Sequence, residues 1–442
     1  ALTHTHIDKQ AGRQTPGRDQ LRFPAEVHCS IQHHSPCGLV GRRRRRSSHT
    51  IAMPSSSAQL SSSEIGEAGC VACVKDFEGA AANRVTSKAW DYYRSGADTE
   101  HTLRDNEAAF LRYRFRPRIL RDVSSIDLST SLLDTPVSLP ICLAPSAMQK
   151  MACERGELDT AKAAAKKGTI MTLSTLSTTS IEDVAREFRK WSTQGQGALW
   201  FQLYIYKDRD ITRRLIKRAE AAGFQALCLT VDTPYLGNRR ADARNKFEMP
   251  AGLSLANFID DPSLKSGQAN KDSWLLEYTQ SLFDASISWK DIAWLRGITS
   301  LKIILKGIVT AEDAELATHY GVDGILVSNH GGRQLDGAPA TLDALREVVQ
   351  AVSTVSGSLC EVYLDGGVRT GADVAKALAL GARAVFVGRP VLWGLAHSGA
   401  SGVESVLSIL GKELRSTMGL LGATKVSELT SNMVTPVVPS RL

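Results

Sequence analysis

The sequence lacks the features that mark several large classes of protein. It has no run of about 18 apolar residues, so it predicts no membrane-spanning helix. It also has no HExxH, no GxxxxGK[ST] and no GxGxxG motif, which removes the best evidence for a zinc protease or a nucleotide fold. The eight cysteines form no dense framework in 442 residues, so we expect reduced thiols. Cys70 and Cys73 make a single CxxC without further partners at metal spacing, and we therefore expect no metal site.

The N-terminal part of the chain carries most of the excess positive charge. Residues 1–52 hold nine basic and three acidic residues, which accounts for +6 of the net charge of +7. The arginines from Arg42 to Arg46 have no aromatic residues between them for stacking bases, so we expect no nucleic-acid partner. Their surroundings mix Pro, Ser, His and Gln without a hydrophobic period, which is typical of disorder. We expect a disordered leader over residues 1–75, and we hypothesise that residues 1–52, which precede Met53, are not translated.

From residue 140 onward, short apolar runs alternate with longer amphipathic stretches. The amphipathic stretches carry helix signals: Thr310 and Asp313 predict a capping box, and Gly321 marks an end. The apolar runs are continuous, as in strands that are buried on both faces of a parallel sheet. The eight predicted strands are 140–145, 169–174, 198–204, 226–232, 302–308, 324–330, 361–367 and 384–389.

Eight strands that are each followed by a helical pattern predict an α/β fold, the (β/α)₈ or TIM barrel, in one domain over residues 76–442. A doubly wound open sheet is the alternative, which the missing dinucleotide motif disfavours. The gap between Asp232 and Lys302 predicts a long insertion between the fourth and fifth strands, part of which, at 259–273, we expect to be a mobile lid. Upstream of the barrel, a helix is predicted at 78–96.

Polar side chains end almost every predicted strand. In a barrel of this kind, the carboxyl-terminal ends of the strands meet at one rim, where catalytic residues are found. One polar strand end is usually structural, but eight in register predict a functional site. In chain order they are Ser146, Ser174, Gln202 with Tyr204, Thr230 with Asp232, Lys306, Ser328 with His330, Asp365 with Gly366 and Gly367, and Gly388 with Arg389.

His330 is the candidate base at this rim. Of the four histidines beyond residue 52, it is the one that closes a predicted strand, and imidazole titrates near neutral pH. Asp232 is a candidate to orient it and to stabilise its charged form. Lys306 is either a Schiff-base nucleophile or a buried cation opposite developing negative charge.

Arginines supply anion-binding groups near the same rim. Arg333 offers a planar fork to a carboxylate, and Arg239 offers a second cation. Glycine-bearing turns after the last two strands let backbone N–H groups approach a phosphate, and Arg369 and Arg389 add positive charge there. The sequence therefore predicts a phosphate-bearing cofactor.

Several motifs together resemble those of the FMN-dependent 2-hydroxy acid oxidase and dehydrogenase family, which includes glycolate oxidase, lactate oxidase and mandelate dehydrogenase. They are YYRSGA, LAPSAMQKMA, FQLYIYKDR, LTVDTP, LKGI, SNHGGRQLD, DGGVRTGADV and GRPVLWGLA, spread over roughly residues 76–435. The resemblance implies a barrel that binds FMN and oxidises an (S)-2-hydroxy acid, such as glycolate or lactate, to a 2-oxo acid. It also implies a homotetramer or homo-octamer.

Carried over position by position, the resemblance implies roles for individual residues. The implied catalytic residues are His330, with Asp232 as its partner, Tyr204 near the substrate hydroxyl, and Lys306 at the flavin N1 and O2 edge. The implied substrate-binding residues are Tyr92, Leu176, Tyr204, Arg239 and Arg333. The implied FMN-binding residues are Pro145, Ser146, Ala147, Ser174, Gln202, Thr230, Lys306, Ser328, Asp365, Gly366, Gly367, Arg369, Gly388 and Arg389.

Two further features bear on the substrate and the acceptor. Leu176 stands where glycolate oxidases typically have tryptophan, so we expect lactate or a larger 2-hydroxy acid to be used at least as well as glycolate. The terminal Ser440-Arg441-Leu442 is a variant of a peroxisomal address, which predicts recognition by the import receptor and a peroxisomal location. A peroxide producer fits that compartment, and this favours O₂ as the acceptor.

Three other functions stay open. They are a cytochrome- or quinone-linked 2-hydroxy acid dehydrogenase, a catalytically silent flavin-barrel binding protein, and an FMN isomerase or lyase. The sequence has no visible haem-binding or membrane segment, which disfavours the first. The presence of His330, Arg333, Lys306 and Tyr204 disfavours the second.

Overall fold

A computed structural model describes residues 71–193, 195–258 and 281–437. Most of the expected leader, the predicted lid at 259–273 and the terminal Ser440-Arg441-Leu442 lie outside the described residues. Within the described ranges, no helix combines the length and the apolar character needed to cross a membrane. The described cysteines are free thiols, namely Cys73, Cys142, Cys153, Cys228 and Cys360.

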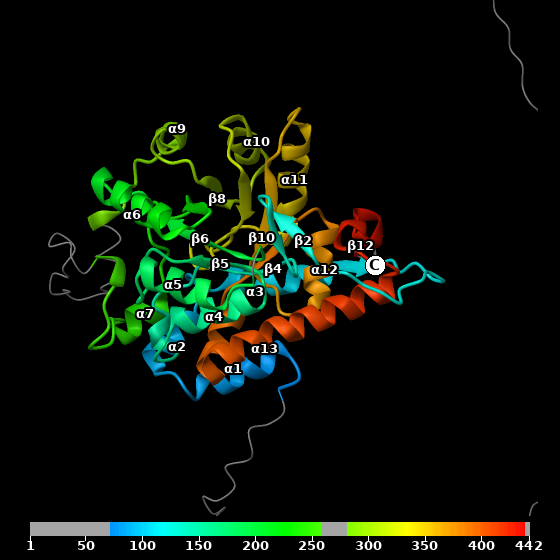
Figure 1. Ribbon diagram of the computed structural model, residues 1–442, viewed down its shortest axis with the longest axis horizontal. Helices are drawn as coiled ribbons and strands as arrows, with labels where there is room; N and C mark the ends of the chain where they lie inside the picture. The colour runs from blue at the N-terminus through cyan, green and yellow to red at the C-terminus, as the bar shows by residue number, and fades with distance from the viewer. Residues whose placement is uncertain (1–70, 194, 259–280, 438–442) are drawn as a thin grey trace, which may run out of the picture. The chain divides into compact units, whose positions relative to one another are not determined.

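Eight parallel strands close into a barrel in the order β10-β11-β4-β5-β6-β7-β8-β9 (Figure 1). Strands that are neighbours in sequence are neighbours in the sheet, and β11 pairs with β4 to close it. The prediction of a (β/α)₈ barrel is thus confirmed. The strands are β4 (Ile141–Leu143), β5 (Ile170–Leu173), β6 (Ala198–Leu203), β7 (Ala226–Thr230), β8 (Lys302–Ile308), β9 (Gly324–Val327), β10 (Glu361–Asp365) and β11 (Val385–Val387).

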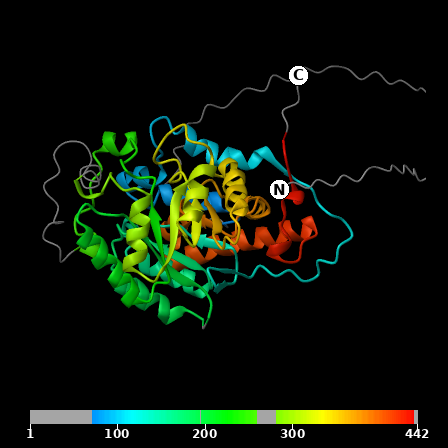
Figure 2. The same ribbon diagram turned by 90° about the horizontal axis from the view of Figure 1, so that it is seen from above.

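Helices connect the strands. Thr310 and Thr370 start two of them, since each side chain accepts a hydrogen bond from a backbone N–H of the first turn. The last helix, α13, is kinked at Ser398 and Gly399 and is seen along its length in orange to red in Figure 2. The helices are α4 (Glu157–Lys166), α5 (Ile181–Trp191), α6 (Arg209–Ala222), α9 (Trp289–Ile298), α10 (Ala311–His319), α11 (Thr341–Thr354), α12 (Gly371–Ala379) and α13 (Arg389–Leu421).

The N-terminal segment forms two helices where the sequence predicted one. These are α1 (Val74–Ala82) and α2 (Ser87–Arg94). The Thr86 side chain accepts a hydrogen bond from the Ala89 N–H and so caps a new helix, which makes the prediction of a single helix at 78–96 wrong. The α1 helix lies along α13 (Figure 1), and Trp90 of α2 packs on Trp393 with ring centroids 4.7 Å apart. The packing attaches the N-terminal helices to the barrel.

Shorter elements complete the described chain. A hairpin of β2 (Thr130–Leu132) and β3 (Thr135–Val137) packs against the apolar residues inside the barrel and covers its amino-terminal end. The strand β1 (Tyr113–Phe115) pairs with β12 (Val434–Pro436). The remaining helical elements are α3 (His101–Ala108), α7 (Arg240–Asn245), η1 (Ala109–Arg112), η2 (Gln149–Met151), η3 (Ala256–Phe258), η5 (Val426–Glu428) and η6 (Ser431–Met433).

The insertion between β7 and β8 is anchored on the chain that follows β6. The Asp284 N–H donates to the Ile205 carbonyl at 3.0 Å, and the Lys207 N–H donates to the Leu282 carbonyl at 2.9 Å. Phe283 therefore stands opposite Tyr206 in a short antiparallel bridge. This attachment brings the described end of the insertion to the carboxyl-terminal mouth of the barrel.

Candidate active site

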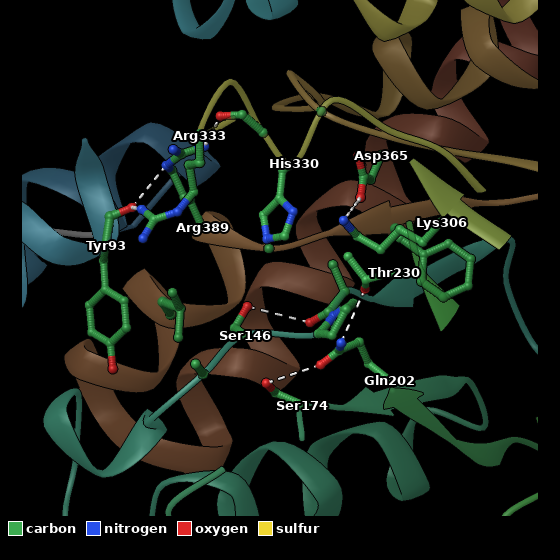
Figure 3. A pocket seen from close by; sticks show the side chains of 18 of the residues that line it. Tyr93, Ser146, Ser174, Gln202, Thr230, Lys306, His330, Arg333, Asp365 and Arg389 are labelled. Atoms are coloured by element: carbon green, nitrogen blue, oxygen red, sulfur yellow. Dashed lines mark hydrogen bonds and ion pairs between the residues drawn. The ribbon is translucent and has the colours of Figure 1, made fainter. Parts of the chain in front are cut away.

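The polar strand ends surround one pocket at the carboxyl-terminal mouth of the barrel (Figure 3). The parallel register places these ends at the same rim, although they are far apart in sequence. The sequence-predicted residues that line the pocket are Tyr92, Pro145, Ser146, Ala147, Ser174, Leu176, Gln202, Tyr204, Thr230, Arg239, Lys306, His330, Arg333, Asp365, Gly366, Gly367, Arg369, Gly388 and Arg389.

Two predicted residues, Asp232 and Ser328, lie beneath this lining. The Ser328 hydroxyl donates to Asp365 Oδ2 at 2.9 Å and accepts from the His330 backbone N–H at 3.1 Å. Asp232 contacts the side chains of His330 and Lys306. Both residues thus support groups that face the pocket.

The His330 ring is held by Asp232, with Nδ1 of the histidine 2.9 Å from Oδ1 of the aspartate. Because a carboxylate accepts, Nδ1 carries the hydrogen and Nε2 keeps a lone pair. Burial is the main cause that lowers the pKa of His330 to about 4. The charge of Lys306 also lowers this pKa, whereas Asp232 raises it. The imidazole is therefore neutral at neutral pH. Its backbone φ of 60° is rare outside glycine, and the bond to Ser328 holds this conformation.

Lys306 lies between two carboxylates without a hydrogen bond to either. Its Nζ is 3.9 Å from Asp232 Oδ2 and 3.9 Å from Asp365 Oδ2, and its side chain is 5 % exposed. Burial lowers the pKa of Lys306, but the two carboxylates outweigh burial and raise it, so the amine is charged. A charged amine is not nucleophilic, which favours the buried cation over the Schiff base. Lys306 Nζ and Asp365 Oδ1 have no hydrogen-bond partner within the described chain, as expected of groups that await a polar ligand.

Backbone carbonyls at the end of α2 hold the partly buried guanidinium groups of Arg333 and Arg389. Arg389 donates to the carbonyls of Tyr93 at 3.0 Å and Ser95 at 3.1 Å (Figure 3). Arg333 donates to the carbonyls of Tyr92 and Ser95. Burial and the neighbouring arginines lower the pKa of Arg389 to about 9 and that of Arg333 to about 10, so both stay charged at neutral pH. Carbonyl dipoles do not neutralise these charges, which makes this side of the pocket suitable for anions.

Arg239 is the third guanidinium group on this side. It is 7 % exposed, and its Nε has no hydrogen-bond partner within the described chain. The guanidinium carbons of Arg239 and Arg333 lie 5.9 Å and 4.9 Å from the ring centroid of Tyr92. Two cations thus converge beside one phenol ring. Such a pair can bind a carboxylate with several charge-assisted hydrogen bonds.

The turn after β10 and the start of α13 form a second anion-binding region. Gly366 and Gly367 have φ of 92° and 76°, and a Cβ at Gly367 would lie 1.9 Å from the Asn106 carbonyl oxygen. Only glycine fits at Gly367. Gly388 directly precedes α13, and both Gly388 and the Arg389 side chain line the pocket there. This combination suits a phosphate.

A chain of side-chain hydrogen bonds crosses the pocket floor from β5 to β7. Ser174 Oγ lies 3.4 Å from Gln202 Oε1, and Gln202 Nε2 donates to Thr230 Oγ1 at 3.1 Å (Figure 3). The Thr175 N–H also donates to Gln202 Oε1, at 3.0 Å. The Gln202 amide is therefore fixed in one orientation.

Sequence reasoning missed the apolar wall of the pocket and a pair of supporting amides. Leu236 and Phe283 line the pocket beside Tyr204, but both lie in an insertion without strand or helix periodicity. Asn106 and Asn329 exchange two side-chain hydrogen bonds, at 2.9 and 2.8 Å. The signal for Asn106 was a short polar residue that is unfavourable inside a helix. Tyr93 was also missed; its hydroxyl donates to the Met148 carbonyl at 2.8 Å.

The donor set fits FMN. The second anion-binding region suits the dianionic phosphate group of FMN. The fixed amide of Gln202 offers hydrogen bonds to its planar ring system. The unpartnered Nζ of Lys306 fits a ring edge that carries oxygen and nitrogen acceptors.

Comparison with known proteins agrees with this geometry. The model of the family described as FMN-dependent dehydrogenase matches residues 81–436. 2-Hydroxyacid oxidase 1 of Homo sapiens is 51% identical over 365 residues, which cover 82% of this chain and 96% of that protein. Glycolate oxidase 1 of Oryza sativa subsp. indica is 50% identical over 362 residues, which cover 82% of this chain and 95% of that protein.

A solved structure supports the same assignment. The crystal structure of mandelate oxidase with (S)-4-hydroxymandelic acid aligns with a TM-score of 0.76 at 38% identity, over 83% of this chain and 99% of that one. The predicted family and cofactor are confirmed. The chain belongs to the family of FMN-dependent dehydrogenases, and it is an FMN-dependent 2-hydroxy acid oxidase.

Proposed function

We propose that the protein oxidises (S)-lactate and longer (S)-2-hydroxy acids to 2-oxo acids, with O₂ as the electron acceptor and hydrogen peroxide as the product. One observation carries the proposal. The converging guanidinium groups of Arg239 and Arg333 line the same pocket as the neutral imidazole of His330. A small acid with a hydroxyl next to its carboxylate can engage both.

Arg239 and Arg333 bind the substrate carboxylate, with Tyr92 beside them. The Arg239 guanidinium is buried and that of Arg333 is partly buried, and a charge removed from water gains most from an ionic partner. Their bonds to the acid fix the reacting carbon relative to His330 and Tyr204. Burial raises the pKa of Tyr204 well above its usual value, so its hydroxyl stays protonated and can donate a hydrogen bond to the substrate.

His330 accepts the proton that leaves the substrate. Its Nε2 has the free lone pair, and the neutral form predominates at neutral pH. Burial alone would raise the pKa of Asp232, but the interactions with His330 and with the Lys306 ammonium outweigh burial and bring it to about 2. Asp232 thus remains ionised and stabilises the imidazolium that forms.

FMN, when bound, supplies the two-electron acceptor. We assign its contacts to Pro145, Ser146, Ala147, Ser174, Gln202, Thr230, Lys306, Ser328, Asp365, Gly366, Gly367, Arg369, Gly388 and Arg389. Lys306 provides a fixed positive charge in the pocket lining, which favours negative charge that develops beside it during the reaction.

A substrate panel tests the proposal. The protein is supplied with glycolate, (S)-lactate, (R)-lactate and 2-hydroxyoctanoate, and both peroxide formation in air and anaerobic bleaching of the flavin are measured. We expect the (S) acids to do both, and kcat/KM for (S)-lactate to equal or exceed that for glycolate, because Leu176 leaves room for a methyl group. A strong preference for glycolate would contradict the substrate assignment. Bleaching without peroxide in air would contradict the acceptor.

We propose further that residues 76–442 act as one catalytic domain and assemble into a homotetramer or homo-octamer in the peroxisome. The terminal Ser440-Arg441-Leu442 supports this location, since the import receptor reads such a C-terminal tripeptide. Light scattering on the protein starting at Met53 tests the assembly. A fluorescent fusion with and without the last three residues tests the location; we expect peroxisomal puncta only when they are present.

A further inference from the structure

The insertion between β7 and β8 contributes an aromatic side chain to the pocket wall. Phe283 lines the pocket and is 5 % exposed. Its ring stacks on that of Tyr204, with centroids 4.2 Å apart and planes inclined by 22°. Tyr204 follows β6 and Phe283 ends the insertion, so the wall is shared by two segments of the chain. Its position depends on both.

The Phe283 ring is held in one place. The Tyr206 ring meets it edge-on, with centroids 5.3 Å apart and planes at 85°, and Phe258 packs on Tyr206 at 5.7 Å. The backbone on either side of Phe283 is bonded to the chain after β6, through the Asp284 N–H and the Leu282 carbonyl. A ring that is fixed by backbone pairing and by aromatic neighbours cannot swing aside when a larger substrate enters.

Phe283 belongs to an apolar part of the pocket lining, whereas Arg239 and Arg333 make another part cationic. Leu176 and Leu236 line the pocket with it, and Leu176 is 5 % exposed. A 2-hydroxy acid whose carboxylate is bound by Arg239 and Arg333 must direct its side chain toward the remaining, apolar lining. Charged or strongly polar side chains would lose hydration there without gaining a partner.

We propose that Phe283 is a specificity-determining residue whose fixed ring limits the length of the substrate side chain. Leu176 leaves room for a short aliphatic group, and Phe283 sets the end of that room. The enzyme therefore prefers short unbranched (S)-2-hydroxy acids to long ones. This inference rests on the proposed function, because it takes the side chain of a 2-hydroxy acid as the group that the wall meets.

The test is the ratio of kcat/KM for 2-hydroxyoctanoate to kcat/KM for (S)-lactate. In Phe283→Ala we expect this ratio to rise about tenfold, the scale on which enzymes discriminate by the fit of apolar groups. A general loss of activity, for example through a shifted Tyr204, affects both acids and cancels in the ratio. A ratio within about twofold of that of the parent enzyme would overturn the inference.

Two variants separate this role from general damage to the packing. Phe224→Ala also removes a buried ring, but Phe224 packs on Phe201 and does not line the pocket, so its ratio should match the parent. An equal rise in Phe224→Ala would overturn the inference. If Phe283→Ala does not fold, Phe283→Leu decides the matter, because it opens part of the space and should give a smaller rise. A parent enzyme that oxidises no 2-hydroxy acid would refute the proposed function, whereas an active parent with an unchanged ratio refutes this inference alone.

Discussion

Two layers of side chains lie one above the other inside the barrel. Each strand contributes one inward-facing residue to the lower layer and its next inward-facing residue to the upper layer. In the lower layer, Trp200, Tyr363 and Phe386 pack together and are at most 1 % exposed. In the upper layer, Gln202 and Asp365 take the next inward positions of β6 and β10. Side chains alternate along a strand, so residues two apart point to the same side. The composition of the interior thus changes from apolar to polar within about 7 Å of strand.

The same change from an apolar to a polar residue occurs on the neighbouring strands. The lower residue is apolar or weakly polar, and the upper residue carries a hydroxyl or a charge, in the pairs Cys228 and Thr230, Ile304 and Lys306, and Leu326 and Ser328. Within the described chain, Lys306 Nζ and Asp365 Oδ1 of the upper layer have no hydrogen-bond partner, whereas the rings of the lower layer pack against one another. Substitutions in the two layers should therefore fail in opposite ways.

His330→Gln should show the largest effect. The substitution removes the proton acceptor from the upper rim but leaves the lower layer intact. We expect kcat/KM for (S)-lactate to fall about 10³-fold, within the range for loss of a general base, with little change in thermal midpoint or bound FMN. Steady-state kinetics and thermal denaturation measure the two quantities. His319→Gln, at an exposed helix end, is the matched control, and a similar loss in that variant would contradict the assignment.

Trp200→Ala should do the reverse. Removing the largest ring of the lower layer leaves a cavity between Tyr363 and Phe386, and we expect a loss of about 3–5 kcal/mol in the free energy of unfolding. The rate per bound flavin should stay close to that of the parent, since Trp200 does not line the pocket. Urea denaturation and flavin-normalised kinetics test this. Intact stability with lost activity would contradict the division into layers.

The contrast between the layers also explains what could be predicted from sequence. Each strand could be identified because an apolar run that stops on a polar residue is a local pattern. The predicted ends were too late on the last three strands, since His330, Gly367 and Arg389 follow β9, β10 and β11. The predicted helix at 78–96 failed because Thr86 forms a local cap that hydrophobic periodicity does not reveal. The bonds of Arg333 and Arg389 to the end of α2 could not be predicted, since their acceptors are backbone carbonyls, which every residue has.

The prediction from sequence also omitted site residues that lie in segments without hydrophobic periodicity. Phe283 reaches the pocket only because the insertion pairs with the chain after β6. Asn106 contacts the loops behind the pocket only because α3 packs against the loops after β9 and β10, which sequence separation alone does not indicate. Both contacts are tertiary, so a local reading of the sequence had no access to them.

The Asn106 and Asn329 pair should give an intermediate effect, because it supports the upper layer without lining it. Asn329 directly precedes His330, and the Asn106 carbonyl lies against Gly367. Asn106→Ala removes both hydrogen bonds to the Asn329 amide and the acceptor of the buried Thr341 N–H, so we expect a loss of about 1–3 kcal/mol in the free energy of unfolding. Kinetics should show a decrease of about tenfold in kcat/KM from a displaced His330. The double variant with Asn329→Ala should lose less than the sum of the two single variants, and strict additivity would contradict a coupled pair.

The smallest expected effect is the change of kcat/KM with pH. This dependence distinguishes an imidazole whose pKa is lowered by burial from an exposed one. His330 must be unprotonated to accept a proton, so activity is complete above its pKa and falls as the pH falls through it. An ordinary imidazole would lose about tenfold of its free base between pH 7.5 and 5.5. Because burial lowers the pKa of His330 to about 4, we expect kcat/KM for (S)-lactate to change less than about twofold over this range.

The variant Asp232→Asn extends this test. It removes the charge that raises the pKa of His330, so kcat/KM should show no new decrease near pH 6.5, even if the variant is slower. A decrease of kcat/KM near pH 6.5 in the parent enzyme would mean that the base is solvated like a surface histidine. That result would contradict the assignment of His330 to the upper layer.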